Sequence, residues 1–167
     1  NVDAARWFCR EVWPAVLNQV PDARFWLAGA RPSREVRLLE RLPGVEVFGS
    51  VPDVRPYLSA ASVAVVPIRS GSGTRLKVLE AMAAGKAVVS TDMGVEGLEV
   101  DGAVRRANGA PEMEQAVIEL LRDRTARRAL AARAAEVVRG YDWQKITPRF
   151  AVLLAATMRE SLQARTA

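Results

Sequence analysis

Residues 63–91 read VAVVPIRSGSGTRLKVLEAMAAGKAVVST, and this stretch decides the fold class. It begins with the most apolar run of the chain, 63–68, continues through a loop of small residues, 70–74, and ends in a second apolar run, 86–91. Between the loop and the second run, apolar residues recur at helical spacing over 75–84. The pattern predicts a buried strand, a turn, a helix and a second buried strand, which is the repeating unit of a parallel sheet.

The same alternation extends to both sides of this unit. Apolar runs predict further strands at 24–30, 45–48 and 103–106. Helical spacing and capping signals predict helices over 3–20 with Asp3 as N-cap, 33–42, 53–61, 111–123, 125–139 and from 143 toward 162. We therefore expect an α/β fold with a doubly wound, mostly parallel, Rossmann-like sheet, covered by helices on both faces.

Length and composition favour one domain. The chain has 167 residues, of which 50% are hydrophobic and 26% charged. A chain of this size buries about 68 to 70% of its unfolded surface, so 1–167 is expected to form a single domain with a helical C-terminal extension. Its apolar runs are far shorter than the roughly 18 residues of a membrane-spanning helix. Asn1 is not a start Met and no signal peptide follows, so we interpret the sequence as a fragment.

The chain has one cysteine and no histidine. Cys9 therefore cannot form an internal disulfide, and we expect it in the core. Without histidine there is no Ser-His or Cys-His pair, which excludes hydrolases of that kind. The 24 basic against 19 acidic residues give a net charge of +5, which suits an anionic ligand. Aromatic residues are few and not interleaved with the arginines, so we expect no nucleic-acid partner.

The small-residue loop carries the first candidate site residues. Gly71 and Gly73 have no Cβ, so the backbone can approach a ligand closely and aim consecutive amides at it. The loop leads into a helix N-terminus, whose unpaired amides and partial positive charge favour a phosphate. The alternative is a plain turn in which Ser72 or Thr74 caps the helix.

The predicted helix over 75–84 has two faces. The face expected to pack in the core carries Leu76, Leu79 and Ala83. Lys77 and Glu80 lie side by side on the neighbouring face, where an exposed ion pair would contribute about 0.2 to 0.5 kcal/mol. Alternatively, Glu80 accepts hydrogen bonds from the two hydroxyls of a ribose while Lys77 or Arg75 meets a phosphate, and each such bond contributes about 1.5 to 3 kcal/mol.

These residues resemble a known family. The run GSGTRLKVLEAMAAGKAVV, residues 71–89, resembles the nucleotide-sugar-binding segment of group 1 glycosyltransferases, which have the two-lobed B-type fold. The resemblance continues in GSVPDVRPYLSAASVAVVP, residues 49–67, in VEGL, 95–98, and in YDW, 141–143. The opening NVDAARWF is similar to the first helix of the C-terminal lobe in a bacterial exopolysaccharide-associated subgroup. The resemblance covers essentially the whole chain and implies that it is this C-terminal, donor-binding lobe.

The resemblance also implies roles for single residues. The glutamate that matches Glu80 binds the nucleotide ribose in that family, and the loop Gly71–Arg75 lies near the diphosphate and the donor sugar. Many members carry a second glutamate eight residues earlier, where this chain has Ser72. Contacts with the donor-sugar hydroxyls then pass to Ser72, Thr74 or Lys77 as possible substitutes.

The remaining candidates complete the expected donor site. The backbone around Val51 and Pro52 resembles the segment that meets the nucleobase. No catalytic residue is identified. The candidate donor-binding residues are Gly71, Ser72, Gly73, Thr74, Arg75, Lys77, Glu80, Val51 and Pro52.

The implied reaction is transfer of a sugar from a nucleoside diphosphate to a saccharide or lipid-linked acceptor, with retention. No metal or other cofactor is expected, because helix-terminal amides and basic side chains can neutralise the leaving diphosphate. The acceptor-binding N-terminal lobe lies outside 1–167, so the fragment alone is expected to be inactive. We expect a cytoplasmic enzyme, and the basic residues of the C-terminal helices form either a solvated face or a contact with an anionic membrane; they are Arg122, Arg124, Arg127, Arg128, Arg133 and Arg139.

Two other functions fit the sequence less well. A non-catalytic nucleotide-binding or receiver-like signalling module would need an aspartate at the end of a central strand, but the third strand ends in Val66-Pro67-Ile68. A sugar epimerase of the same two-lobed fold would rely on catalytic histidines and acids, which are not found. The glycosyltransferase lobe therefore remains the preferred interpretation.

A last expectation concerns the centre of the sheet. In a doubly wound sheet of order 3-2-1-4-5-6 the first strand is central, and the resemblance places that strand before Asn1. We predict that strands 25–28 and 63–66 pair directly, or that a segment of a second molecule fills the space between them. Tyr141 and Trp143 are expected to anchor the last helix.

Overall fold

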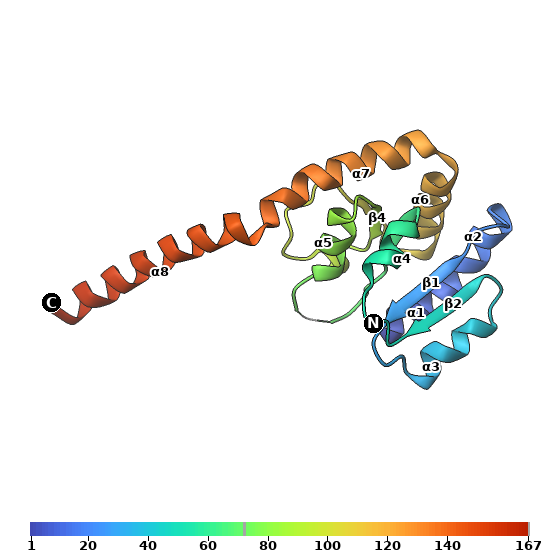
Figure 1. The fold of residues 1–167 in the computed structure, drawn as a ribbon, viewed down its shortest axis with the longest axis horizontal. Coiled ribbons are helices and arrows are strands. Elements are labelled where there is room, and N and C mark those ends of the chain that lie inside the picture. The colour runs from blue at the N-terminus through green and yellow to red at the C-terminus, as the bar shows by residue number, and fades with distance from the viewer. Residues whose placement is uncertain (72, 167) are drawn as a thin grey trace.

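The computed structural model describes residues 1–71 and 73–166, apart from the side chains of 149, 153 and 159–166. The strands are β1 (Phe25–Gly29), β2 (Val45–Gly49), β3 (Val63–Val66), β4 (Ala87–Ser90) and β5 (Arg105–Arg106). The helices are α1 (Val2–Trp7), η1 (Phe8–Val12), α2 (Trp13–Gln19), α3 (Arg34–Arg37), η2 (Leu38–Arg41), α4 (Arg55–Ala60), α5 (Leu76–Ala83), η3 (Met93–Val95), α6 (Ala110–Arg122), α7 (Arg124–Val138), η4 (Arg139–Tyr141) and α8 (Trp143–Thr166). The predicted elements are all present, and the α/β fold with parallel strands and a helical C-terminus is confirmed (Figure 1).

The strands form two parallel sheets within the described residues. One sheet has the order β1-β2 and the other the order β3-β4-β5. The prediction that 25–28 and 63–66 pair directly is therefore wrong. Helices on both faces bridge β1 and β3 and hold them in place without a hydrogen-bonded ladder between them.

Two apolar clusters make up the core. In the first, the α1–α2 stretch and α6 pack on β1, β3 and β4, and the ring centroids of Phe8 and Phe25 lie 4.5 Å apart with the rings tilted by 37°. In the second, α5 and α7 pack on β3 and β4, around the fully buried Met82 and Val88. Cys9 is buried in the first cluster, as predicted. Helices thus cover both faces of the strands.

The N-terminal helical stretch differs in detail from the single helix predicted over 3–20. A π-helical segment, η1, separates α1 from α2, and Pro14 lies in the first turn of α2. Proline has no N–H and its ring crowds the preceding turn, which accounts for the interruption. The prediction of Asp3 as N-cap is wrong, because α1 begins at Val2 and its N-cap is Asn1. The Asp3 carboxylate instead accepts three hydrogen bonds from Arg69, the shortest 2.8 Å long.

Helix α5 buries a different face from the one predicted. Val78, Ala81 and Met82 are buried, whereas Leu76 is 55% exposed and Ala83 is exposed. The prediction that Leu76 and Ala83 pack in the core is wrong, because α5 packs on β3, β4 and α7 through the other stripe.

Helix α8 projects away from the body of the molecule (Figure 1). Its first residue, Trp143, is 76% exposed, so the prediction that it anchors the helix is wrong. Tyr141 does anchor the preceding turn, since its hydroxyl accepts a 2.6 Å hydrogen bond from the Glu99 amide. Within the described part of the chain, no helix is long and apolar enough to span a bilayer.

Candidate functional site

The loops that follow β3 and β4 are tied together at the carboxyl edge of their sheet. Ser90 Oγ donates to the Val66 carbonyl (3.1 Å), and Thr91 Oγ1 donates to the Ile68 carbonyl. The Gly94 amide in turn donates to Thr91 Oγ1 (3.0 Å). These bonds are buried or half-buried, so the loop that carries the candidate residues starts from a fixed platform.

Gly94 is required at this platform for lack of space. A Cβ at this position would collide with Ser90 Oγ and lie 2.8 Å from the Val66 carbonyl oxygen. Backbone atoms cannot move aside as a flexible side chain can, so only glycine allows the two loops to approach this closely.

Gly71 and Gly73 are required for a different reason. Their φ angles are +129° and +101°, which L-residues rarely adopt, while nothing lies within 4 Å of an added Cβ. The loop therefore needs glycine for its backbone conformation, and both residues are exposed. Ser72, between them, lies outside the described residues.

The N-terminus of α5 follows this loop without a side-chain cap. The N-cap is Arg75, with no capping hydrogen bond, so Thr74 does not cap the helix and that part of the plain-turn alternative is wrong. Among described residues, the amides of Leu76 and Lys77 have no hydrogen-bond acceptor. Two donors at the positive end of the helix dipole are thus left for an anion.

Arg75 lies inside the site and not on its surface. Its side chain is 5% exposed, and Nη2 forms a 2.8 Å ion pair with Glu96 Oε2. The same nitrogen donates to the Gly71 carbonyl (3.2 Å) and contacts Met93 Sδ at 3.2 Å. The Arg75 guanidinium therefore links the glycine loop, through the Gly71 carbonyl, to the segment after β4, through Glu96.

One atom of Arg75 is left without a partner. Its Nε is buried and has no hydrogen-bond acceptor in the described part of the chain. A buried unpaired donor costs about 1 to 3 kcal/mol. The strong bond to Glu96 and the contact with the loop carbonyl offset this cost at the other end of the guanidinium.

Lys77 and Glu80 are both exposed on the outer face of α5. The described residues show no ion pair between them, although they lie one turn apart. The interpretation of the two residues as a simple helix pair is therefore not supported, and both side chains face solvent close to the uncapped amides.

Val51 and Pro52 follow β2, at the carboxyl edge of the other sheet. Val51 is half-buried and Pro52 is exposed. The next residue, Asp53, accepts bonds from the side chain and the amide of Arg55, which hold the pKa of its carboxyl below the usual range. No hydrogen bond or ion pair among described residues joins this segment to the loop before α5.

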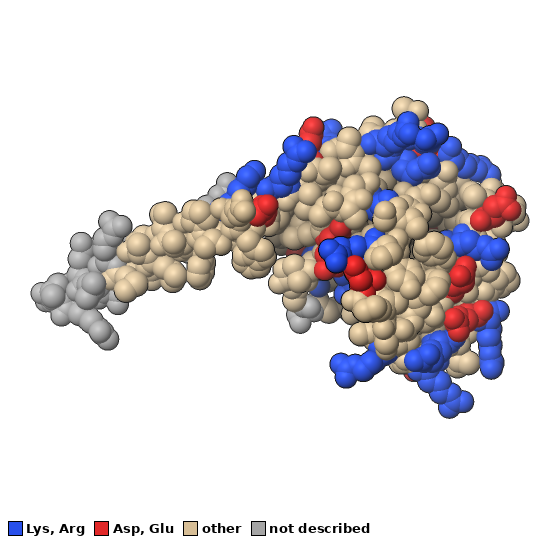
Figure 2. All heavy atoms as spheres, in the orientation of Figure 1, with Lys and Arg blue, Asp and Glu red and all other residues tan. Residues whose placement is uncertain are grey.

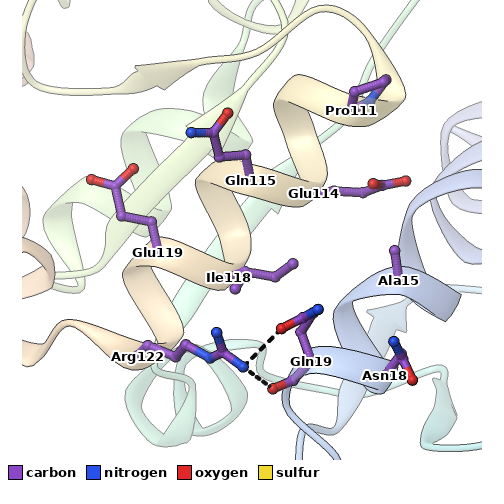
Figure 3. A pocket seen from close by; sticks show the side chains of 9 residues that line it. All are labelled: Ala15, Asn18, Gln19, Pro111, Glu114, Gln115, Ile118, Glu119 and Arg122. Carbon is purple, nitrogen blue, oxygen red and sulfur yellow. Dashed lines mark hydrogen bonds between the residues drawn. The ribbon is translucent and has the colours of Figure 1, made fainter.

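Two surface hollows lie on other elements. One, of about 480 Å³, separates α2 from α6, and there Arg122 donates to the carbonyl and the Oε1 atom of Gln19 at 2.5 and 2.9 Å (Figure 3). The second, of about 450 Å³, lies between β5 and the start of α6. Neither is lined by a predicted donor-site residue.

In the described part of the chain, no three His, Cys, Asp or Glu side chains gather as metal ligands would.

Sequence reasoning missed the roles of Glu96 and Gly94. Both lie in the stretch TDMGVEG, residues 91–97, which follows a predicted strand end. A glycine and an acid directly after a parallel strand are a signal for the carboxyl edge. The contacts themselves could not be read from this stretch, because Arg75, the partner of Glu96, lies 21 residues away in sequence, and the Val66 carbonyl that leaves no space for a Cβ at Gly94 belongs to another strand.

Comparisons with known proteins give the family. The family model described as "Glycosyl transferases group 1" matches residues 1–123. A phosphatidyl-myo-inositol mannosyltransferase of Mycolicibacterium smegmatis is 30% identical over 142 residues, which cover 80% of this chain and 37% of that protein.

A solved structure has the same fold. It is the pneumococcal O-GlcNAc transferase GtfA in complex with UDP and GlcNAc, with a TM-score of 0.65 and 13% identity, over 92% of this chain and 33% of that one. The chain thus spans about a third of the length of the relatives it matches. Since the family model covers residues 1–123 of 167, the chain belongs to the group 1 glycosyltransferases.

Proposed function

We propose that residues 1–167 form the C-terminal, donor-binding lobe of a glycosyltransferase of the bacterial exopolysaccharide-associated subgroup. It transfers a sugar from a nucleoside diphosphate to a saccharide or lipid-linked acceptor, with retention. One observation carries the proposal: α5 has an uncapped N-terminus, follows a loop shaped by two glycines, and exposes Lys77 and Glu80 within its first five residues.

The two similar proteins support a sugar nucleotide as donor. GtfA was solved with UDP and GlcNAc, and the mycobacterial relative is a phosphatidyl-myo-inositol mannosyltransferase. These names apply to those proteins, and for this chain we propose only that the donor is a sugar carried on a nucleoside diphosphate.

The diphosphate takes the place of the missing cap. The amides of Leu76 and Lys77 donate to its oxygens, and the ammonium group of Lys77 adds a full positive charge. Arg75, which is held by Glu96, positions the loop behind them. The helix end and Lys77 stabilise the charge that develops on the leaving diphosphate, so the proposed reaction needs no metal and no other cofactor.

The rest of the donor lies on both sides of the diphosphate. Glu80, one turn into α5, accepts hydrogen bonds from the ribose hydroxyls, and the backbone at Val51 and Pro52 meets the nucleobase. On the other side, the loop with Gly71, Gly73 and Thr74 meets the donor sugar, and Ser72 belongs to the same proposed contact.

We also propose a cytoplasmic location at the inner face of the membrane. Figure 2 shows basic side chains gathered where α7 crosses the molecule, and the exposed arginines of this helix are Arg124, Arg128 and Arg133. Arg122 and Arg127 are engaged with backbone carbonyls and are less suited to contact lipid. An anionic surface is the partner that such a group of cations favours.

Replacement of Glu80 by Gln tests the ribose contact. Loss of charged hydrogen bonds costs about 1 to 3 kcal/mol, so affinity for the best nucleotide among UDP, GDP and ADP should fall about 5- to 150-fold in calorimetry. Glu136→Gln, on the exposed side of α7, is the matched control and should bind like the parent. Equal binding by Glu80→Gln and the parent would remove the ribose assignment.

Replacement of Lys77 by Ala tests the phosphate contact. The variant should lose affinity for the nucleoside diphosphate but not for the corresponding nucleoside, because only the former carries the charge that Lys77 meets. Lys145→Ala, at an exposed position of α8, is the control. Equal losses for both ligands would show that Lys77 does not contact phosphate.

A further inference from the structure

Glu96 combines an exposed carboxylate with a buried partner. It follows the short helix η3 after β4, and its Oε2 atom lies 2.8 Å from Nη2 of Arg75. The Arg75 side chain is 5% exposed, whereas that of Glu96 is 65% exposed. In the described part of the chain, Oε1 of Glu96 has no hydrogen-bond partner. One oxygen of this carboxylate is therefore fixed, and the other is free to accept a hydrogen bond.

The buried guanidinium places this carboxylate beside the glycine loop. The same Arg75 nitrogen donates to the Gly71 carbonyl (3.2 Å) and contacts Met93 Sδ. Arg75 is also the N-cap of α5, so one arginine side chain and one hydrogen bond separate Glu96 from the start of that helix. The loop after β3 and the loop after β4 thus meet at a single guanidinium.

The backbone that carries Glu96 is anchored on both sides. Before it, the Gly94 amide donates to Thr91 Oγ1 (3.0 Å), and Val95 is 2% exposed. After it, the Leu98 amide donates back to the Val95 carbonyl (3.0 Å). A side chain on such a segment, with its carboxylate already paired, loses little conformational freedom when it binds a ligand. Glu96 is therefore a preorganised acceptor.

The charged groups around the glycine loop separate into two kinds. The start of α5 offers the ammonium group of Lys77 and the unpaired amides of Leu76 and Lys77. The adjoining loop offers the negative charge of Glu96. A diphosphate is attracted by the first and repelled by the second, so in the proposed complex the hydroxyl-bearing sugar faces Glu96.

We infer that Glu96 is a specificity-determining residue of the donor site. Its free oxygen accepts a hydrogen bond from a hydroxyl of the transferred sugar, and its charge disfavours sugars that carry a carboxylate of their own. The site then selects neutral sugars over uronates, by attraction of one class and repulsion of the other. The inference rests on the proposed function, because it takes a nucleoside diphosphate sugar as the ligand.

Calorimetry on the full natural polypeptide tests this inference with a matched pair of ligands. They are the glucose and glucuronate esters of whichever nucleoside diphosphate, among UDP, GDP and ADP, binds best, and they differ only at C6. The parent should bind the glucose ester at least about tenfold more tightly, because Glu96 repels the carboxylate of the other.

Replacement of Glu96 by Gln keeps the size of the side chain and an acceptor oxygen but removes the charge. Glu96→Gln should bind the glucose ester about fivefold more weakly than the parent does, and the two esters within about twofold of each other. An unchanged affinity for the glucose ester, or an unchanged preference between the two esters, would overturn the inference.

The free nucleoside diphosphate separates this contact from a structural role of Glu96. Its affinity should differ by less than about twofold between Glu96→Gln and the parent, since the free ligand carries no transferred sugar. Glu99→Gln, an exposed residue on the same loop, is the matched control and should bind all three ligands like the parent. If Glu96→Gln weakens all three ligands alike, Glu96 acts only by supporting the loop through Arg75, and the inference is wrong.

A failure of the proposed function would give a different result. If no nucleoside diphosphate binds the parent, or if Glu80→Gln and Lys77→Ala both bind it like the parent, the proposed donor site is wrong and the inference falls with it. If those two variants lose affinity while Glu96→Gln keeps the preference for the glucose ester, the donor site stands and only the inference is wrong.

Discussion

The β3–β4–β5 half and the β1–β2 half of the molecule are built from the same kind of unit but are packed differently. All four residues of β4 are buried, whereas half-buried and exposed positions alternate along β1, where Trp26 is 37% exposed. Side-chain hydrogen bonds also join the loops after β3 and β4, and the described residues show no such bond between the loops after β1 and β2. Because β4 lies between β3 and β5, its side chains are fully covered, and the β3–β4–β5 half is the better packed of the two.

The candidate diphosphate site lies entirely in the better packed half. Its loop starts on the Ser90 and Thr91 platform and is held by Arg75 and Glu96. The proposed nucleobase segment at Val51 and Pro52 lies in the other half. The residues proposed to contact phosphate are thus placed by the fold of one sheet, whereas their distance from the proposed nucleobase segment depends on how the two sheets are joined.

Two glycine substitutions, one in each half, test the difference in packing, and we expect the largest effect on stability from this pair. Gly94→Ala should lower the free energy of unfolding by about 3 kcal/mol, because its Cβ meets Ser90 Oγ and a backbone oxygen. Gly29→Ala, at the end of β1, should change it by less than about 0.5 kcal/mol, since nothing lies within 4 Å of the added Cβ. Urea unfolding measures both, and similar losses would mean that the two halves are packed alike.

The thiol of Cys9 reports on the helical layer that covers both halves. Burial raises its pKa from 9.0 to about 12. Below pH 9 the thiol is neutral in the folded and unfolded states, so its contribution is fully present. Above pH 9 the unfolded chain loses the proton and the folded chain keeps it, so the free energy of unfolding should fall by about 1.4 kcal/mol per pH unit up to about pH 12.

Comparison with Cys9→Ala isolates this contribution from lysine and tyrosine titration. Denaturant unfolding of both proteins at pH 8 and pH 10 gives the difference. An identical pH dependence for the two would mean that the layer over β1 opens readily enough for the thiol to ionise in the folded state.

Of the three sets of changes, Glu96→Gln is expected to have the smallest effect. It measures how much the Arg75–Glu96 contact contributes to the stability of the better packed half. It leaves the buried Arg75 guanidinium without its counter-charge but keeps an acceptor oxygen, and Glu96 itself is 65% exposed. We expect a loss of about 1 kcal/mol in urea unfolding. Glu99→Gln, on the same loop and exposed, should cost nothing measurable, and an equal loss for both would show that the Arg75 contact does not stabilise the loop.

The elements could be predicted because continuous apolar runs bounded by glycine and proline leave little choice of structure. The run predicted as 86–91 forms β4 at Ala87–Ser90, and the helix predicted over 111–123 forms α6 at Ala110–Arg122. The face of α5 could not be predicted. Apolar residues at 76, 79 and 83 and at 78, 81 and 82 both have helical spacing. Contact with the strands buries the second set, and of the first set only Leu79 packs partly against the same cluster.

The site was predictable in part for the same reason. The predicted loop before α5 is present and Lys77 and Glu80 do share an exposed face, whereas the positive φ angles of Gly71 and Gly73 were not part of the prediction. The burial of Arg75 was not predictable, since arginine is rarely buried unless paired and its partner Glu96 comes from another loop. Whether these residues bind donor stays a prediction.

The projecting helix α8 affects how the molecule tumbles. Its 24 residues make a rod about 36 Å long, whereas a compact chain of 167 residues has a radius of gyration of only about 15 Å. Rotation about the axis of the rod then meets less friction than end-over-end rotation. Rotational diffusion of this chain should therefore be anisotropic. Amide nitrogens whose N–H bonds lie along the axis of α8 would relax at different rates from those of the strands.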